Sequence, residues 1–583
     1  MTRRAPGRAR GSRRSIATAL ALLALACGGA PAPEPADLVL VGGKIVTLEP
    51  DRPEVRGLAA RDGAIVALGG DDEVRAYVGP ETRVIDLAGR LAVPGFIEGH
   101  GHFTGLGASL TKLDLTGTRS WEAIVALVAA TAARAEPGEW ILGWGWHQEK
   151  WDSPPPDTVE GYPTHEALSR AVPDHPVMLK HAAGSHGGIL NARALERAGI
   201  GPMTPDPPGG TILRDARGRP TGLLRETAYE IALEAHAAER ARRDAGALEA
   251  EARREIELAD RECLSKGITS FQDAGSDLAT VDRLRAIAEA GELGVRLWVM
   301  LRADDDSLER RIDDYRIEGA GGGHLTVRAI KRAADGALGT HGAWLLEPYD
   351  DLPATAGLNT TPLVELERTA RIALAHGFQL AVHAIGDRAN RETLDLYERV
   401  LAGVPGGREL RWRIEHAQHL AAADVPRFAA LGVIASIQGV HCTSDGPWVP
   451  ARLGPARSAE GAYVWRKLLD SGAVVINGTD TPVEDVDPIA NFYATVARRM
   501  ASGEAFYPEQ RMTRLEALRA ATIDAAYAAF EENVKGSLRP GKLADLTVLS
   551  RDILSVAEDR IPGTAVVYTI VGGRVAFERG GTP

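Results

Sequence analysis

Two histidines, His100 and His102, end an apolar stretch that begins at Val93. Because side chains alternate along a β-strand, residues two positions apart leave the strand on the same side. Two nitrogen ligands at the carboxyl end of a strand suit a divalent metal, and barrel enzymes keep their chemistry at that end. Taken by itself, the pair could also be two loop histidines without a ligand role.

Polar residues recur where later apolar stretches end: Lys331, His383 and His416 close three predicted strands, and Asp480 follows another. A single histidine at a strand end is more often a hydrogen-bonded structural residue than a ligand. However, the carboxyl ends of parallel strands share one face of a barrel, so these residues and the histidine pair converge there. Six such residues on one rim indicate a common site.

The middle of the chain alternates apolar strand candidates with helical stretches, which is the pattern of an α/β fold. Eight strand candidates follow in order, at residues 91–97, 268–273, 295–301, 327–331, 378–383, 411–416, 433–437 and 473–476. Helical stretches at 248–266, 278–290, 363–375, 388–401 and 422–430 separate most of them. Eight such units predict a (β/α)8 TIM barrel over residues 93–534.

Two further regions lie outside the barrel pattern. Short strands and turns fill 37–92 and 535–583, and each set is too small to be stable alone, so together they predict one composite β-domain, a small β-sandwich built from both chain ends. The first two barrel strands are too far apart for a single helix. Residues 140–245, with a strand-like stretch at 176–180, therefore predict an insertion over the barrel mouth.

The first 30 residues have the build of a signal peptide: arginines precede an apolar run at 16–26 that is too short to span a bilayer. Leu25-Ala26-Cys27-Gly28-Gly29 resembles a bacterial lipoprotein box, in which Cys27 is lipidated. Ordinary cleavage near Ala30 is the alternative. The segment predicts an exported protein of the periplasm or cell envelope, held to the membrane only by a lipid anchor.

Charge and cysteine content exclude several classes. The formal net charge is -12 and becomes more negative once the arginine-rich leader is removed, which argues against binding nucleic acid or an anionic membrane through a basic surface. Cys263 and Cys442 are the only other cysteines and lie far apart, so neither a disulfide framework nor a cysteine zinc site is expected. The expected partner is a small-molecule substrate, and the oligomeric state stays open.

The motifs resemble those of the amidohydrolase superfamily, specifically its amidohydrolase-3 or YtcJ-like branch, which includes N-substituted formamide deformylase. The matching segments span the chain after the leader and are Pro94-Gly95-Phe96 with the histidine pair, Lys331 with Asp335-Gly336, 382–390, Ile414-Glu415-His416, 478–483 and Gly541-Lys542-Leu543-Ala544-Asp545. Glu98 departs from the pattern, because an aspartate is common before the histidine pair. No departure removes a ligand.

The resemblance implies a role for each rim residue. His100 and His102 would hold one metal, His383 and His416 a second, and a carboxylated Lys331 would bridge the two. The alternative for Lys331 is an ion pair with Asp335 or another carboxylate. The cofactor would be one or two divalent ions, zinc first, although iron, manganese or nickel suits the same ligands.

The resemblance also implies the catalytic residues. Asp480 would bind the first metal, take a proton from metal-activated water and pass it to the departing nitrogen. In the insertion, the segment around His186 and Asn191 resembles the family's "GH…N" stretch, so His186 is a candidate for contact with substrate or oxyanion.

Further substrate-binding candidates are Trp146, Asn191, Gln438 and His441. Packing of the insertion is the alternative for Trp146, and loop solvation is the alternative for Gln438 and His441.

The function predicted is therefore a metal-dependent hydrolase of carbon-nitrogen bonds other than peptide bonds, acting on an N-acyl or formamide-type amide. The same site could instead hydrolyse a lactone or phosphoester or deaminate a ring. The alternative from a different functional class is a lipoprotein that binds a small molecule without catalysing its turnover.

Overall fold

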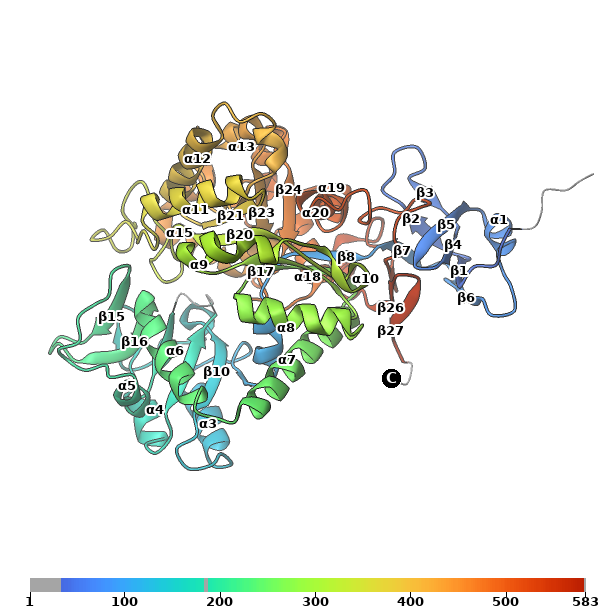
Figure 1. Ribbon diagram of the computed structural model, residues 1–583. Helices are drawn as coiled ribbons and strands as arrows, with labels where there is room; N and C mark the ends of the chain where they lie inside the picture. The colour runs from blue at the N-terminus through green and yellow to red at the C-terminus, as the bar shows by residue number, and fades with distance from the viewer. Residues whose placement is uncertain (1–32, 183–186, 581–583) are drawn as a thin grey trace, which may run out of the picture.

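The computed structural model describes residues 33–182 and 187–580 of the 583-residue chain. Figure 1 shows a central barrel, a small β-domain on the right that contains strands from both ends of the chain, and an insertion domain at the lower left. Within the described residues, no helix combines the length and the apolarity needed to cross a membrane.

The centre is a nearly closed barrel of eight parallel strands, as the sequence predicted. In spatial order they are β24 (Val475–Gly478), β23 (Ile434–Gln438), β22 (Arg413–His416), β21 (Gln379–Ala384), β20 (Leu325–Ala333), β18 (Arg296–Leu301), β17 (Ile268–Ser276) and β8 (Phe96–Gly101). The last seven strand predictions each overlap one of these strands. Because the strands run parallel, their carboxyl ends gather on one rim.

The first strand prediction needs a correction. Residues 91–97 form two strands rather than one: β7 (Leu91–Pro94) belongs to the small β-domain, and β8 begins the barrel. The break falls at Gly95, whose N–H donates to the Asp545 carbonyl at 2.9 Å and where a Cβ would lie 2.2 Å from Thr269 Oγ1. The close approach of two chain segments at this glycine lets the strand change sheets.

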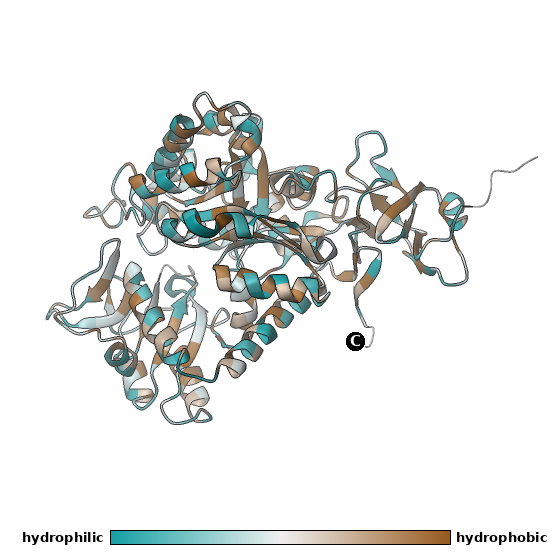
Figure 2. Cartoon of the chain, viewed as in Figure 1, coloured by the Kyte–Doolittle hydropathy of each residue, from teal (hydrophilic) through white to brown (hydrophobic). Residues whose placement is uncertain are grey.

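Helices cover the outside of the barrel. The main ones are α7 (Ala245–Ser265), α8 (Leu278–Glu289), α11 (Leu363–Ala375), α12 (Asp387–Leu401), α13 (Val425–Leu431), α17 (Trp465–Asp470), α18 (Pro488–Ala497), α19 (Arg514–Ala520) and α20 (Ile523–Ala528). Capping fixes their starts: the Asp244 carboxylate accepts from Ala247 N and the Asp277 carboxylate from Thr280 N. In Figure 2 these helices show hydrophilic stretches, whereas the strands beneath are mostly hydrophobic.

The small β-domain consists of two packed sheets. The first has the order β5 (Ala64–Gly69), β4 (Gly57–Arg61), β1 (Leu38–Val41), β6 (Arg83–Asp86), and the second β27 (Arg574–Glu578), β26 (Val566–Val571), β25 (Leu546–Leu549), β7, β2 (Lys44–Val46), β3 (Glu54–Val55). One apolar core contains Leu40 from the first sheet and Ile45 and Val548 from the second. The pairing of β7 with β25 confirms that both chain ends build this domain.

The insertion domain, defined here as residues 113–240, has a sheet of its own. Its strands run in the order β15 (Gly210–Arg214), β16 (Pro220–Glu226), β14 (Gly187–Leu190), β13 (Val177–His181), β10 (Ile141–Trp146) and β9 (Leu113–Asp114), so the sheet includes chain before residue 140. Helices α3 (Trp121–Ala132) and α4 (Glu166–Ala171) share one apolar cluster with it, and α5 (Ala192–Arg197) and α6 (Thr227–Arg240) share another.

A buried ion pair joins the barrel to the small β-domain. Arg296 of β18 donates from Nε to Asp545 Oδ2 at 2.8 Å and from Nη2 to Asp545 Oδ1 at 3.2 Å, and both side chains are buried. This two-point geometry gives the pair a fixed orientation. Asp545 also accepts the Gly572 N–H at 2.7 Å, so one carboxylate ties the two regions together.

Arg296→Met should lower the free energy of unfolding by about 3–5 kcal/mol, because the variant leaves a buried carboxylate without its charged partner. Urea unfolding measures the loss. Arg193→Met is the matched control, since its pair with Glu196 is solvent-exposed and worth about 0–1 kcal/mol. Equal losses in the two variants would contradict the structural role given to Arg296.

Candidate metal centre

The structure gathers all six predicted ligands around one cavity. His100 lies on β8, Lys331 on β20, His383 on β21 and His416 on β22, while Asp480 follows β24. With His102 they line a cavity of about 200 Å³ at the barrel rim. One nitrogen each of His100 and His416 and one Asp480 oxygen lie within 4.8 Å of one another, which is close enough for one metal ion to reach all three.

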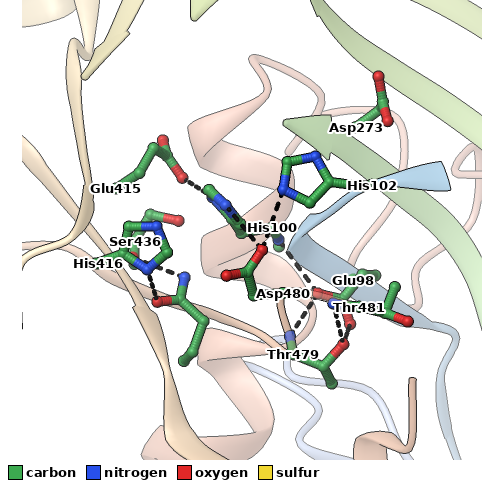
Figure 3. Close-up of polar contacts among 12 residues, drawn as sticks. Glu98, His100, His102, Asp273, Glu415, His416, Ser436, Thr479, Asp480 and Thr481 are labelled. Carbon is green, nitrogen blue, oxygen red and sulfur yellow. Dashed lines mark hydrogen bonds and ion pairs between the residues drawn. The ribbon is translucent and has the colours of Figure 1, made fainter. Parts of the chain in front are cut away.

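His100 is held by a chain of buried charges. Its Nδ1 contacts Glu415 Oε2, and Glu415 in turn accepts from Arg413 Nε at 2.7 Å and Nη2 at 3.0 Å. Burial favours a neutral Glu415, but the charges of Arg413 and His100 outweigh it and hold the pKa below its usual range. A carboxylate at Nδ1 assigns the ring proton to that atom, so His100 Nε2 is left to face the cluster (Figure 3).

His416 is oriented in the same way by an amide. Its Nδ1 donates to Gln438 Oε1 at 2.6 Å, which leaves Nε2 as the acceptor. Burial first, and then the neighbouring His383 and His100 rings, lower the pKa of His416 well below its usual value, so the imidazole is neutral. The backbone at His416 has φ 76°, a conformation rare for a non-glycine residue.

Asp480 completes the group from the loop after β24. Its Oδ1 lies 3.2 Å from His102 Nε2 and 3.5 Å from His100 Nε2 (Figure 3). Burial raises its pKa, but the contacts with these two histidines outweigh burial and lower it well below the usual value. Like His416, Asp480 has a left-handed backbone, with φ 59°. The backbone of the loop is fixed by Asp480 N donating to the His100 carbonyl at 2.7 Å.

The cluster fits a cation. Among the described residues, His100 Nε2 and Asp480 Oδ1 are buried yet make no hydrogen bond of good geometry, and both are atoms that ligate metals. Burial and Lys331 oppose a protonated His100, but Glu415 and Asp480 outweigh them and raise its pKa. The site therefore favours a positive charge beside its two carboxylates, which a bound divalent ion supplies.

His383 is placed by the loop residue Asp335. His383 Nε2 lies 3.5 Å from Asp335 Oδ1, and its ring centroid is 4.4 Å from that of His416. The Asp335 carboxylate also accepts the N–H groups of Trp344 at 2.8 Å, Ile385 at 3.0 Å and Gly386 at 2.8 Å. One buried carboxylate thus fixes the loops that follow β20 and β21.

Lys331 lies in the cavity wall without an ion pair or hydrogen bond of its ammonium to any described residue, including Asp335. Burial lowers its pKa to about 8, so a fraction of the amine is neutral at neutral pH. A neutral amine is the form that can add carbon dioxide. The position is compatible with the bridging role that the resemblance implies.

Glu98 fastens the first strand to the last. It accepts Thr479 N at 2.5 Å, Thr479 Oγ1 at 3.1 Å and His100 N at 3.3 Å (Figure 3). Burial raises its pKa to about 8. The side chain of Glu98 is long enough to bring its carboxylate to the loop that carries Asp480.

A second cavity of about 60 Å³ adjoins the same cluster. It shares His383, His416 and Asp480 with the first cavity, and its remaining wall includes Leu338 and Trp448. His441 lines this cavity with its ring parallel to that of His416, at a centroid distance of 6.3 Å. Its Nε2 is buried and has no hydrogen-bond partner among the described residues, so the site leaves it available to a substrate.

Three of the other predicted substrate-binding residues make contacts that stabilise the fold. Trp146 is buried in the insertion domain, donates to the Leu179 carbonyl at 2.9 Å and stacks on Trp151. Asn191 caps α5 by accepting from Ala194 N at 2.9 Å. Gln438 positions His416. Neither Trp146 nor Asn191 lines either cavity. Strand alternation directs the Trp146 side chain into the insertion domain, and the Asn191 side chain is used in capping α5. His186 and Cys27 lie outside the described residues.

Several residues of the site were not predicted. Arg413 and Glu415 alternate with apolar residues on β22, and a charged pair with period two in an apolar strand is a signal for a polar barrel interior. Glu226, with φ 49°, and Arg302 also line the first cavity. Both follow or end strands in regions where the sequence shows no motif, so no comparable signal marks them.

Glu415→Gln should weaken zinc binding about 10–100-fold, because the amide no longer fixes the His100 tautomer or raises its basicity. Competition with a chromophoric chelator measures the affinity. Glu230→Gln is the matched control, since Glu230 lines the same cavity without contacting a predicted ligand. If both variants lose equal affinity, the effect is long-range charge and the positioning role of Glu415 is refuted.

Three curated proteins are similar over nearly the whole chain. Protein LONG AFTER FAR-RED 3 of Arabidopsis thaliana is 32% identical, covering 94% of this chain and 92% of its own. YtcJ of Bacillus subtilis is 30% identical over 92% and 99% of the two chains. N-substituted formamide deformylase of Arthrobacter pascens is 27% identical over 94% and 99%.

A solved structure and a family model also match this chain. The crystal structure of a metal-dependent hydrolase from Pyrococcus horikoshii superimposes with a TM-score of 0.71 at 26% identity, covering 90% of this chain and 99% of that one. The model of the amidohydrolase family (Amidohydro_3) matches residues 83–577. With the ligand cluster and the barrel, these likenesses show that the chain is a YtcJ-like member of the amidohydrolase family and a metal-dependent hydrolase.

Proposed function

We propose that the protein hydrolyses a carbon-nitrogen bond other than a peptide bond, in an N-acyl or formamide-type amide. The observation that carries this proposal is the pair of cavities that meet at His383, His416 and Asp480. A bond held at the metal ligands would have one of its two sides in each cavity. The formamide deformylase among the relatives supports the amide as the bond class.

The proposed cofactor is one or two divalent ions, with zinc as the first choice because imidazole and carboxylate ligands suit it. His100, His102 and Asp480 would hold one position, His383 and His416 a second, and a carboxylated Lys331 would be a ligand shared by the two. When bound, the metal supplies Lewis acidity and makes water acidic enough to act as a nucleophile near neutral pH.

Asp480 is the proposed proton carrier. Its Oδ1 accepts the proton of the attacking water and passes it to the amide nitrogen as the carbon-nitrogen bond breaks, which yields a carboxylic acid and an amine. The transfer to nitrogen is required because an unprotonated amide nitrogen is a poor leaving group. The contacts with His100 and His102 stabilise the carboxylate form that must begin the cycle.

The insertion domain contributes residues to both cavities. Glu226, Thr227 and Glu230 line the first cavity, and His147 and Lys150 line the second. These residues come from separate strands and helices of the insertion, so its packing sets the shape available to a substrate.

His383→Ala and Asp480→Ala should each lower kcat/KM for N-substituted formamides by at least about 100-fold, because each removes a ligand and Asp480 also moves the proton. Amine release by the zinc-loaded protein is the readout. His376→Ala is the matched control, since His376 lies on the surface beside Asp313. Full activity in both variants would refute the mechanism.

A panel containing an N-acyl amide, a lactone, a phosphodiester and an aminopurine separates the bond classes. The proposal predicts turnover of the amide above the other three. Faster turnover of any of these would assign the site to that chemistry instead.

We propose on the resemblance that Lys331 is carboxylated in the working enzyme. The buried, unpaired amine supports the modification. Carbon-13 NMR of protein exchanged with labelled bicarbonate should show one carbamate resonance that is absent from Lys331→Ala. If the carbamate resonance is absent from both proteins, Lys331 is a free amine and the proposed carboxylation is wrong.

We propose from the N-terminal pattern that the protein is exported to the periplasm or cell envelope and anchored through lipidated Cys27. Expression with a radiolabelled fatty acid in a bacterial host should label the wild type, and Cys27→Ser should release an unlabelled protein from the membrane fraction. Membrane retention of an unlabelled wild type would contradict the anchor.

A further inference from the structure

Arg302 is a positive side chain in the wall of the larger cavity that no described residue neutralises. It directly follows β18 and lines the cavity together with His100 and Lys331. It is exposed, and its guanidinium makes neither a hydrogen bond nor an ion pair within the part of the chain that the structure describes. Arg332 in the same wall differs, because it donates to Asp305 at 2.7 Å and Thr369 at 2.9 Å.

The backbone leaves room beside Arg302. Its N–H donates to the Ser276 carbonyl at 2.9 Å, which fixes the start of the side chain at the rim. At the neighbouring Gly275, with φ 129°, an added Cβ would lie 3.4 Å from the Cβ atoms of both Arg302 and Lys331. The glycine therefore leaves open the space between this arginine and a candidate metal ligand.

The surroundings of Arg302 contain both signs of charge, with Lys180 nearby and Glu226 and Glu230 in the same cavity wall. Lys180 of β13 lies close enough for interaction: burial lowers its pKa to about 8, and the charges of Lys112 and Arg302 add to that effect. Glu230 lines the same cavity, but it forms no ion pair with Arg302 among the described residues. A guanidinium presents paired N–H groups that match a carboxylate, so an anionic ligand is the natural partner of this wall.

The two cavities also differ in size. The one that contains Arg302 measures about 200 Å³, and the one beside Trp448 and Leu338 about 60 Å³. If one amide spans both, the smaller cavity accommodates a short acyl group and the larger one the amine side. The anionic group then belongs to the amine side of the substrate.

We propose that Arg302 binds a carboxylate on the amine portion of the substrate, which makes short-chain N-acyl amino acids the substrate class. This inference rests on the proposed amide hydrolysis and specifies it. Arg302 contributes binding and orientation, and the bond-breaking chemistry stays with the ligand cluster.

The test compares N-acetylalanine with its neutral counterpart N-acetylalaninamide on the zinc-loaded protein. The wild type should favour the carboxylate by about tenfold to a hundredfold in kcat/KM, the range expected for a charge-assisted hydrogen bond. Arg302→Met should reduce the ratio to about one. Arg310→Met, which removes an exposed arginine that does not line the cavity, should keep the wild-type ratio.

Calorimetric binding to the zinc-loaded Asp480→Ala variant separates the two proposals. Tighter binding of N-acetylalanine than of N-acetylalaninamide, lost in the Asp480→Ala/Arg302→Met double variant, supports the carboxylate site. This result would hold even if the wild type hydrolyses neither compound, in which case the proposed amide hydrolysis fails and the binding role of Arg302 stands. Equal hydrolysis and equal binding of the two compounds, or a preference that survives Arg302→Met, would overturn the role of Arg302. Binding of neither compound would also overturn it.

Discussion

The interior of the barrel depends on one buried arginine. Arg413 donates to both oxygens of Glu415, to Gln272 Oε1 at 2.5 Å, to the Gly99 carbonyl at 2.9 Å and to Ser436 Oγ at 3.0 Å. These partners lie on β22, β17, β8 and β23. A buried charge without partners costs several kcal/mol, so the arginine requires the strands to keep this arrangement. The same Glu415 orients His100, and the metal centre is therefore part of the packing of the barrel.

The second constraint is the junction between the first and last strands. β8 and β24 come so close that a Cβ at Gly99 would lie 2.6 Å from the Asn477 carbonyl oxygen. The backbone bonds continue beyond the strands, with His102 N donating to the Thr481 carbonyl at 2.7 Å. Glu98 adds side-chain contacts to the same loop. The strained backbones of His416 and Asp480 persist because the elements around them are fixed from several directions.

Much of this arrangement could be predicted from the sequence because it follows strand periodicity. Apolar runs located the strands, and the polar residues at their ends indicated that His383 and Asp480 lie on the same rim before any geometry was known. The split at Gly95 was missed because β7 and β8 form one apolar run, and only the approach of Thr269 and Asp545 shows the change of sheet.

Other features depend on tertiary contacts that leave no local pattern. The aromatic side chain of Trp146 is typical of a substrate contact, but its position in the sheet of the insertion domain points the side chain into the apolar core. Arg302 shows the opposite case: its proposed role rests on the absence of a partner among the described residues of the cavity, and that property exists only once the chain is folded. The substrate is therefore the part of the function least accessible from sequence.

The most direct test of the account is anomalous X-ray diffraction at the zinc edge from crystals of the zinc-loaded protein. We expect a peak about 2.0–2.2 Å from His100 Nε2, with Asp480 Oδ1 or His416 Nε2 as further ligands. A zinc peak ligated by other residues, or zinc-loaded active protein without a peak at this cluster, would contradict it.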